Sequence, residues 1–159
     1  MSRTTVGFLL SALIWLVVGG LIGYAMAADQ SLIYVLRDVH AHVLLVGFVS
    51  LMIFGVAYHI LPRFSGRPLF SDGLAAAHLW MADIGLIGMS VGMGPLSDTG
   101  WRYWTLAIFG GVQFLGFLFF AFNLLRTVLP MPAPGPSPAM AQAMARTQAR
   151  RGGGEPEPK

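Results

Sequence analysis

The 159-residue chain is 55% hydrophobic and only 11% charged, whereas a soluble domain carries roughly a quarter charged residues. It contains no cysteine, which excludes disulfides, thiolate metal ligands and cysteine nucleophiles. The net charge of +3 comes largely from the C-terminal tail, and no basic patch with interleaved aromatic residues indicates nucleic-acid binding. The composition therefore indicates a small integral membrane protein.

Four apolar stretches are each long enough to cross a bilayer, which takes about 20 residues. They predict transmembrane helices near 6–27, 39–61, 74–95 and 103–125. The first stretch also resembles a signal peptide, because Ala25-Met26-Ala27 is typical of a cleavage site. Its apolar core is longer than the roughly 7–15 residues of such a signal, so we expect a retained helix. The predicted fold is all-α, an integral membrane four-helix bundle over residues 1–129.

Proline and glycine residues mark the expected ends of the predicted helices. Pro62 and Gly66 are expected to end the second helix, and Pro95 and Gly100 mark the turn before the fourth. Residues 130–159 begin with the linker "PMPAPGPSP" and end with the polar "RRGGGEPEPK", which predicts a disordered tail. Between these two segments, "AMAQAMARTQAR" could form a short helix on the membrane surface.

Arginine residues are distributed unequally over the two ends of the predicted spans. One side carries Arg3, Arg63, Arg67 and Arg126, and the other carries Arg37 and Arg102 beside Asp29, Asp38 and Asp98. The positive-inside rule then predicts a multi-pass protein of a bacterial or archaeal cytoplasmic membrane, with both termini in the cytoplasm.

Small residues recur at the spacing that lets helices pack closely. The pairs are Gly19 and Gly23, Gly88 and Gly92, and Ala107 and Gly111. The pattern indicates helix packing, either within one chain or between chains.

Two histidines, His40 and His42, open the second span in the sequence "DVHAH". Side chains two residues apart on a helix diverge by about 200°, so the two imidazoles cannot grip one metal ion together. They could serve two sites on opposite sides of the helix, and haem iron is a fitting ligand because it takes axial imidazole and its porphyrin is apolar. The alternative is that both imidazoles hydrogen-bond water and headgroups at the outer interface.

Other polar groups lie within or beside the spans. Asp83 is deep in the third helix, where a buried carboxylate is costly and finds a partner or stays protonated; it could relay protons or lock helices together. His59 and His78 are expected near the inner boundary, as interfacial groups or as members of a polar relay. We expect Gln113 and Ser90 to make packing hydrogen bonds.

The stretch "HAHVLLVGFVSLMIFGVAYHILPRFSGR" resembles the tenth transmembrane helix of subunit I of the haem-copper oxidases. In that family a His-x-His pair opens the helix and an aromatic Pro-x-Phe-x-Gly turn closes it. "AAAHLWMADIGLIGM" is similar to the eleventh helix, and the first and last spans would be the ninth and twelfth. The resemblance covers about residues 6–126 and implies one four-helix arc of the subunit I fold.

The resemblance also implies roles for the histidine pair. In the family the first histidine is the axial ligand of the high-spin haem, and the second is one of two axial ligands of the low-spin haem. Carried over, His40 takes the high-spin role and His42 the low-spin role, with haem b as the expected cofactor. The same resemblance places haem near the outer face, which agrees with the orientation that the arginines predict.

Several residues that the family needs for oxygen reduction are absent. Its copper site takes further histidines from the sixth and seventh helices, and the low-spin haem takes another from the second helix. This chain has 4 histidines, and none stands in those positions. Copper is therefore not expected, and the chain by itself is not expected to be an oxidase.

The leading hypothesis is a b-type cytochrome of aerobic respiration that transfers electrons or senses through haem. Copies of the chain could place second helices side by side, so a homo-oligomer could complete a bis-histidine site. The alternatives are an accessory subunit of a respiratory oxidase complex that binds no haem, and a split-off part of subunit I.

Reporter fusions test the predicted topology. A reporter placed after Arg37 should report the outer side and one after Arg126 the cytoplasmic side, because an odd number of further spans separates them. Activity of both reporters on the same side would contradict this topology.

Overall fold

A computed structural model of the chain describes residues 2–95, 99–129 and 137–152. In these ranges all regular structure is helical. In chain order the elements are α1 (Arg3–Ala28), η1 (Gln30–Leu32), α2 (Ile33–His42), η2 (Val43–Ser50), α3 (Leu51–Phe64), α4 (Asp72–Met93), α5 (Thr99–Val128) and α6 (Pro138–Gly152).

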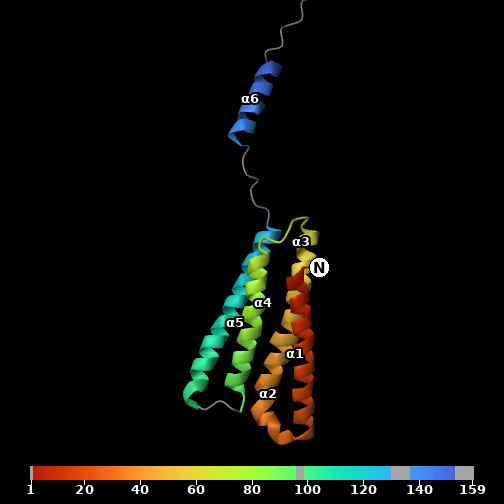
Figure 1. The fold of residues 1–159 in the computed structure, drawn as a ribbon, viewed down its shortest axis with the longest axis vertical. Coiled ribbons are helices and arrows are strands. Elements are labelled where there is room, and N and C mark those ends of the chain that lie inside the picture. The colour runs from red at the N-terminus through yellow and green to blue at the C-terminus, as the bar shows by residue number, and fades with distance from the viewer. Residues whose placement is uncertain (1, 96–98, 130–136, 153–159) are drawn as a thin grey trace, which may run out of the picture.

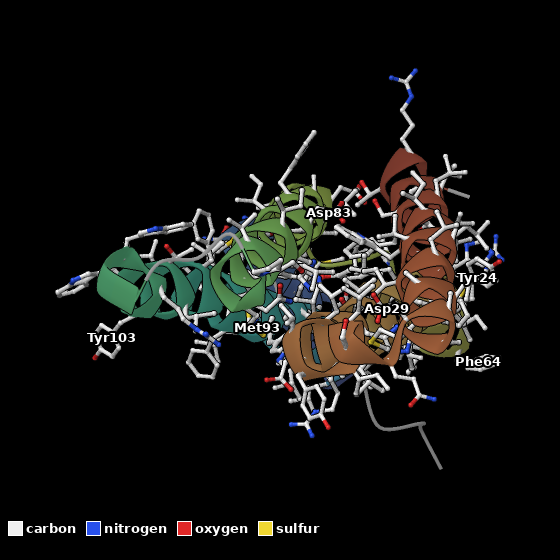
Figure 2. All side chains as sticks on the ribbon, turned by 90° about the horizontal axis from the view of Figure 1, so that it is seen from below. Tyr24, Asp29, Phe64, Asp83, Met93 and Tyr103 are labelled. Carbon is white, nitrogen blue, oxygen red and sulfur yellow. The ribbon has the colours of Figure 1, made fainter. Side chains whose placement is uncertain are left out.

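Four apolar helices in the described part of the chain are long enough to span a membrane, which confirms the predicted class of fold. In Figure 1, α1 runs beside the helix formed by α2, η2 and α3, and α4 runs beside α5. The two hairpins meet where α4 packs on α1 and on the second span. Viewed end-on in Figure 2, α5 lies at one side of the bundle with α4 next to it, and α1 lies at the opposite side beside the second span.

The second span begins earlier than the hydropathy pattern predicted. Helical structure runs without interruption from Gln30 to Phe64, so the expected connection "ADQSLIYVLRD" is mostly helix. Asp29 caps its start, because the carboxylate accepts hydrogen bonds from the backbone N–H and hydroxyl of Ser31 at 2.9 and 2.7 Å. The Ser31 hydroxyl and then its N–H lower the pKa of the Asp29 carboxyl below its ordinary value. Arg37 therefore lies on a helix and not in a loop.

The middle of this span is a π-helix, η2. Such wide turns are rare and occur mostly near functional sites. The hydroxyl of Ser50 donates to the carbonyl of Leu45 at 2.8 Å, five residues back. Because η2 follows His42 directly, the wider turns set the direction of the histidine pair relative to α3.

The helix ends differ in detail from the expected stops. Pro62 lies inside α3, which continues to Phe64, and the chain turns at Gly66, where φ is +64°. The residue Gly100 lies inside α5, so the preceding turn is shorter than expected.

The tail contains the short helix that the sequence allowed, α6. The adjoining residues 130–136 and 153–159, where disorder was predicted, lie outside the described residues.

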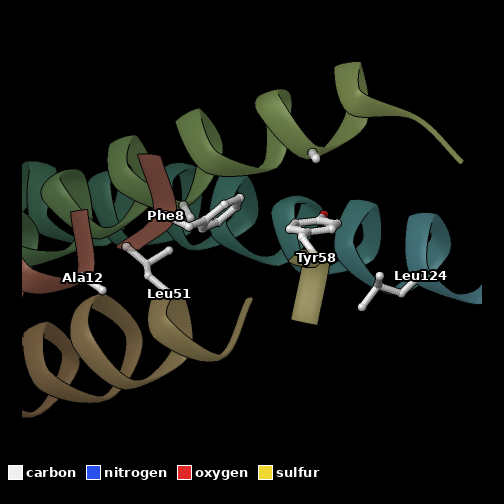
Figure 3. Packing of buried hydrophobic residues seen from close by; sticks show 7 residues of the cluster. Phe8, Ala12, Leu51, Tyr58 and Leu124 are labelled. Carbon is white, nitrogen blue, oxygen red and sulfur yellow. The ribbon is translucent and has the colours of Figure 1, made fainter. Parts of the chain in front are cut away.

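The apolar core lies toward the end of the bundle that holds the N-terminus. Figure 3 shows Phe8 and Ala12 of α1 close to Leu51 and Tyr58 of α3, with Leu124 of α5 beyond them. Phe8, Ala12 and Leu51 are at most 1% exposed. Ala75 and Ala82 of α4 belong to the same cluster, so all four spans contribute to one core.

Glycines set the close approaches between the spans. Any Cβ at Gly19 would overlap Leu44, and one at Gly88 would overlap the ring of Phe109. The pairs Gly19–Gly23 and Gly88–Gly92 thus pack within the chain. Gly111, in contrast, has no described neighbour within 4 Å of an added Cβ, and the same holds for Gly20 and Gly110.

Substitution of Gly47 tests this packing. A Cβ there would lie 2.7 Å from Cγ of Trp15 and 2.8 Å from Cδ2 of Leu86, so Gly47→Ala should lower the free energy of unfolding by about 1–3 kcal/mol, as overpacking does. The matched control is Gly100→Ala, which meets open space and should leave stability equal or slightly higher, since alanine favours helix. Thermal unfolding in detergent measures both; equal loss in the two variants would contradict the packing account.

Candidate functional site

His40 lies in the half of the second span that begins at Gln30 and is fixed against α1. Its Nδ1 lies 3.1 Å from the carbonyl oxygen of Gly19, and the ring occupies the space beside Gly23, where an added Cβ would come within 2.9 Å of Cε1. A carbonyl only accepts hydrogen bonds, so Nδ1 carries the proton. The lone pair of this imidazole therefore stays on Nε2.

His42 is held by its own helix. Its Nδ1 donates to the carbonyl oxygen of Asp38 at 2.9 Å, so Nε2 again keeps its lone pair. The side chain is half-buried. Unlike His40, which is bonded to α1, His42 makes its hydrogen bond within α2.

The carbonyl partners select one tautomer for both imidazoles, in which the neutral ring has its proton on Nδ1 and its lone pair on Nε2. Histidines that ligate iron or zinc are neutral, and the second ring nitrogen usually donates to a carbonyl or carboxylate that fixes the ring and raises its basicity. His40 and His42 both meet this condition, on separate partners. Their chemistry therefore fits axial ligation of haem iron.

The other two histidines have different partners. His59 lies one helical turn from Arg63, and its Nε2 accepts a hydrogen bond from that guanidinium. His78 is fully buried, so the interfacial position expected from its place in the sequence is wrong. Its ring lies 4.8 Å from that of Phe54 and 5.0 Å from that of Phe8.

Further buried polar groups lie near His78, at the end of the bundle that holds the N-terminus. The hydroxyl of Tyr58 lies 3.2 Å from Nδ1 of His78. The side-chain amide of Asn123 donates to the carbonyl of Ser71 at 2.8 Å and accepts from its N–H at 3.0 Å. The sequence analysis missed Tyr58 and Asn123; a single asparagine in the apolar run of α5 was the available signal.

Asp83 joins α4 to α1. Its two carboxylate oxygens accept hydrogen bonds from the hydroxyl of Ser11 and the indole N–H of Trp15, both at 2.8 Å. The residues suggested as a relay, Asp83, His78 and His59, thus have separate hydrogen-bond partners, and the structure does not bring them together.

Two expected packing hydrogen bonds are missing from the described residues. The side-chain amide of Gln113 and the hydroxyl of Ser90 are buried without a partner there, as is Nε2 of His78. The expectation for Gln113 and Ser90 was therefore wrong: the Gln113 amide packs against Gly85 instead.

Comparison with known proteins gives one match. The family Cytochrome C and Quinol oxidase polypeptide I matches residues 3–146. The chain belongs to this family. The matched range contains the four spans and all 4 histidines. No curated protein matches the chain.

Membership of the oxidase polypeptide I family confirms the resemblance seen in the second and third spans. It relates the chain to a respiratory membrane protein, and the histidine pair lies in the matched range. Across the described residues, no three side chains of histidine, aspartate or glutamate gather into a group that could hold a metal ion.

Proposed function

We propose that this protein is a membrane-embedded haem b protein that transfers single electrons or senses through the bound haem. The observation that carries the proposal is the state of the histidine pair: His40 and His42 each donate Nδ1–H to a backbone carbonyl and keep the lone pair on Nε2. Membership of the oxidase polypeptide I family supports haem as the group that these atoms would bind.

His42 would hold a low-spin haem and His40 a high-spin one, as the family resemblance implies. Bound haem supplies a one-electron couple whose potential depends on the axial ligands and on burial. The chain's own contribution is to fix each ring through its Nδ1–H and to surround the site with apolar side chains. Gly23 leaves the room that the His40 ring needs.

A second axial ligand for His42 has to come from another copy of the chain or from another protein. His59 lies 17 residues further along the helix, about 25 Å away at 1.5 Å per residue, and Arg63 occupies its Nε2. His78 is enclosed by aromatic rings near the same end. A homo-oligomer is the simpler choice, and the open surfaces at Gly20, Gly110 and Gly111 would let helices of two copies approach closely.

The orientation of the protein belongs to the same proposal. Both termini would lie in the cytoplasm and the histidine pair near the outer face of a bacterial or archaeal membrane, because Arg3, Arg63, Arg67 and Arg126 share one side. Arg126 of this group packs its guanidinium on the ring of Phe70, 5.1 Å from the centroid.

Replacing His42 tests the ligand assignment. His42→Ala should remove the haem or convert it to the high-spin form, because the iron loses an axial imidazole. His59→Ala is the matched control, since this histidine lies on the same span but far from the site, and its spectrum should equal that of the wild type. Absorption spectra of the purified oxidised and reduced proteins provide the measurement. Unchanged spectra in His42→Ala would refute the assignment.

Haem stoichiometry tests the oligomer. The detergent-solubilised protein should have the mass of two or more chains and carry bis-histidine haem, because one chain supplies only His42 to this haem and the second axial imidazole has to come from another copy. It should not consume oxygen with a reduced dye, since the histidines of the family's copper site are absent. A haem-loaded monomer with two histidine ligands would contradict the first claim, and rapid cyanide-sensitive oxygen uptake the second.

A further inference from the structure

Asp83 places a carboxylate at the centre of a membrane span. It lies 11 residues after Asp72 and 10 before Met93, the two ends of α4, which is about 15 Å from either end at 1.5 Å per residue. Carboxylates at this depth are costly and normally pair with another polar or charged group. Among the described residues the recorded ion pair is Arg37–Asp38, at the outer end of the second span.

Asp83 makes two hydrogen bonds, and both of its carboxyl oxygens act as acceptors. One oxygen accepts from Ser11 and the other from Trp15. Both donors are neutral, and a carboxylate has acceptor positions for about four hydrogen bonds. The Asp83 carboxyl group therefore has unused acceptor positions for a cationic donor.

This carboxylate also reaches the surface of the bundle. Figure 2 shows Asp83 between α4 and α1, and its side chain is half-buried. The residues around it on both helices are apolar and exposed: Trp80 at 65% and Ile84 at 47% on α4, and Leu10 at 56% and Ile14 at 62% on α1. We call these residues, together with Ser11, Trp15 and Asp83, the Asp83 face.

A second copy of this chain cannot balance the charge. The arginines of the four spans stand near the helix ends, and the one lysine is Lys159 in the tail. His78 is buried inside the bundle, and the other histidines lie toward the ends of the second span. Lipid tails offer no donor. What remains is a different membrane protein.

We propose that the Asp83 face docks a transmembrane helix of another protein that carries a lysine or arginine in its apolar middle. The cation would pair with the Asp83 carboxylate while Ser11 and Trp15 hold it in place, and the exposed side chains around it would pack on the partner helix. Interhelical polar contacts of this kind stabilise helix association in membranes. The inference is independent of haem binding.

The test uses a synthetic single-span peptide of leucine and alanine with one central lysine, and a matched peptide with methionine at that position. Full-length protein is placed in vesicles of phosphatidylcholine, whose zwitterionic headgroups do not attract the lysine peptide. Energy transfer from the protein's 4 tryptophans to a dye on the peptide reports binding. The lysine peptide should bind about tenfold more tightly than the methionine peptide, the factor expected of a hydrogen bond between charged groups.

Variants separate the Asp83 charge from other causes. Asp83→Asn should abolish the preference for lysine, and Asp83→Glu, which keeps the charge, should retain it. Asp38→Asn and His42→Ala should leave the preference unchanged, so that a failure of the haem proposal would not affect this result. Equal binding of the two peptides to the wild type, or a preference that survives Asp83→Asn, would overturn the proposal. So would Asp83-dependent self-association that the lysine peptide does not reverse, because it would assign the face to a second copy.

Discussion

The close approach of the second span to α1 at Gly19 is the contact on which the histidine site depends. The missing side chain at Gly19 admits Leu44, and the carbonyl of the same residue accepts the hydrogen bond of His40. The bilayer core holds no water that could replace this acceptor. Backbone approach and imidazole orientation are thus set by one residue, and a side chain at Gly19 would disturb both.

The two ends of the bundle serve different purposes. At the end that holds the N-terminus, Tyr58 of α3 pairs with His78 of α4 and Asn123 of α5 hydrogen-bonds Ser71. Aromatic rings pack around Tyr58 and His78. At the other end, His40 and His42 are only half-buried and keep Nε2 free of any described hydrogen bond. Polar groups at the first end hydrogen-bond within the bundle, whereas each histidine at the second end has one ring nitrogen without a described hydrogen bond.

Sequence patterns were sufficient for features that depend on one helix. Hydropathy located the four spans, and helical spacing alone separated the directions of His40 and His42. Hydropathy misplaced the start of the second span because Arg37 and Asp38 interrupt the apolar run, although nothing in residues 30–38 breaks a helix. The π-helix that follows His42 has no comparable sequence signal.

Features that depend on two helices could not be predicted in this way. His78 was expected at the interface from its place near the start of a span, but its burial comes from Phe8, 70 positions earlier, and Phe120, 42 positions later. The partners of Asp83 are likewise 68 and 72 positions away. Gln113 and Ser90 failed in the other direction: both carry groups that can hydrogen-bond, yet neither has a hydrogen-bond partner among the described residues.

The central proposal is that the Nε2 atoms of the histidine pair bind haem in this member of the oxidase polypeptide I family. The most direct measurement is the absorption spectrum of the purified wild-type protein, oxidised and then reduced. Low-spin haem b predicts a Soret band and, on reduction, sharp α and β bands. A protein that folds and carries no such bands after expression with sufficient haem would contradict the claim.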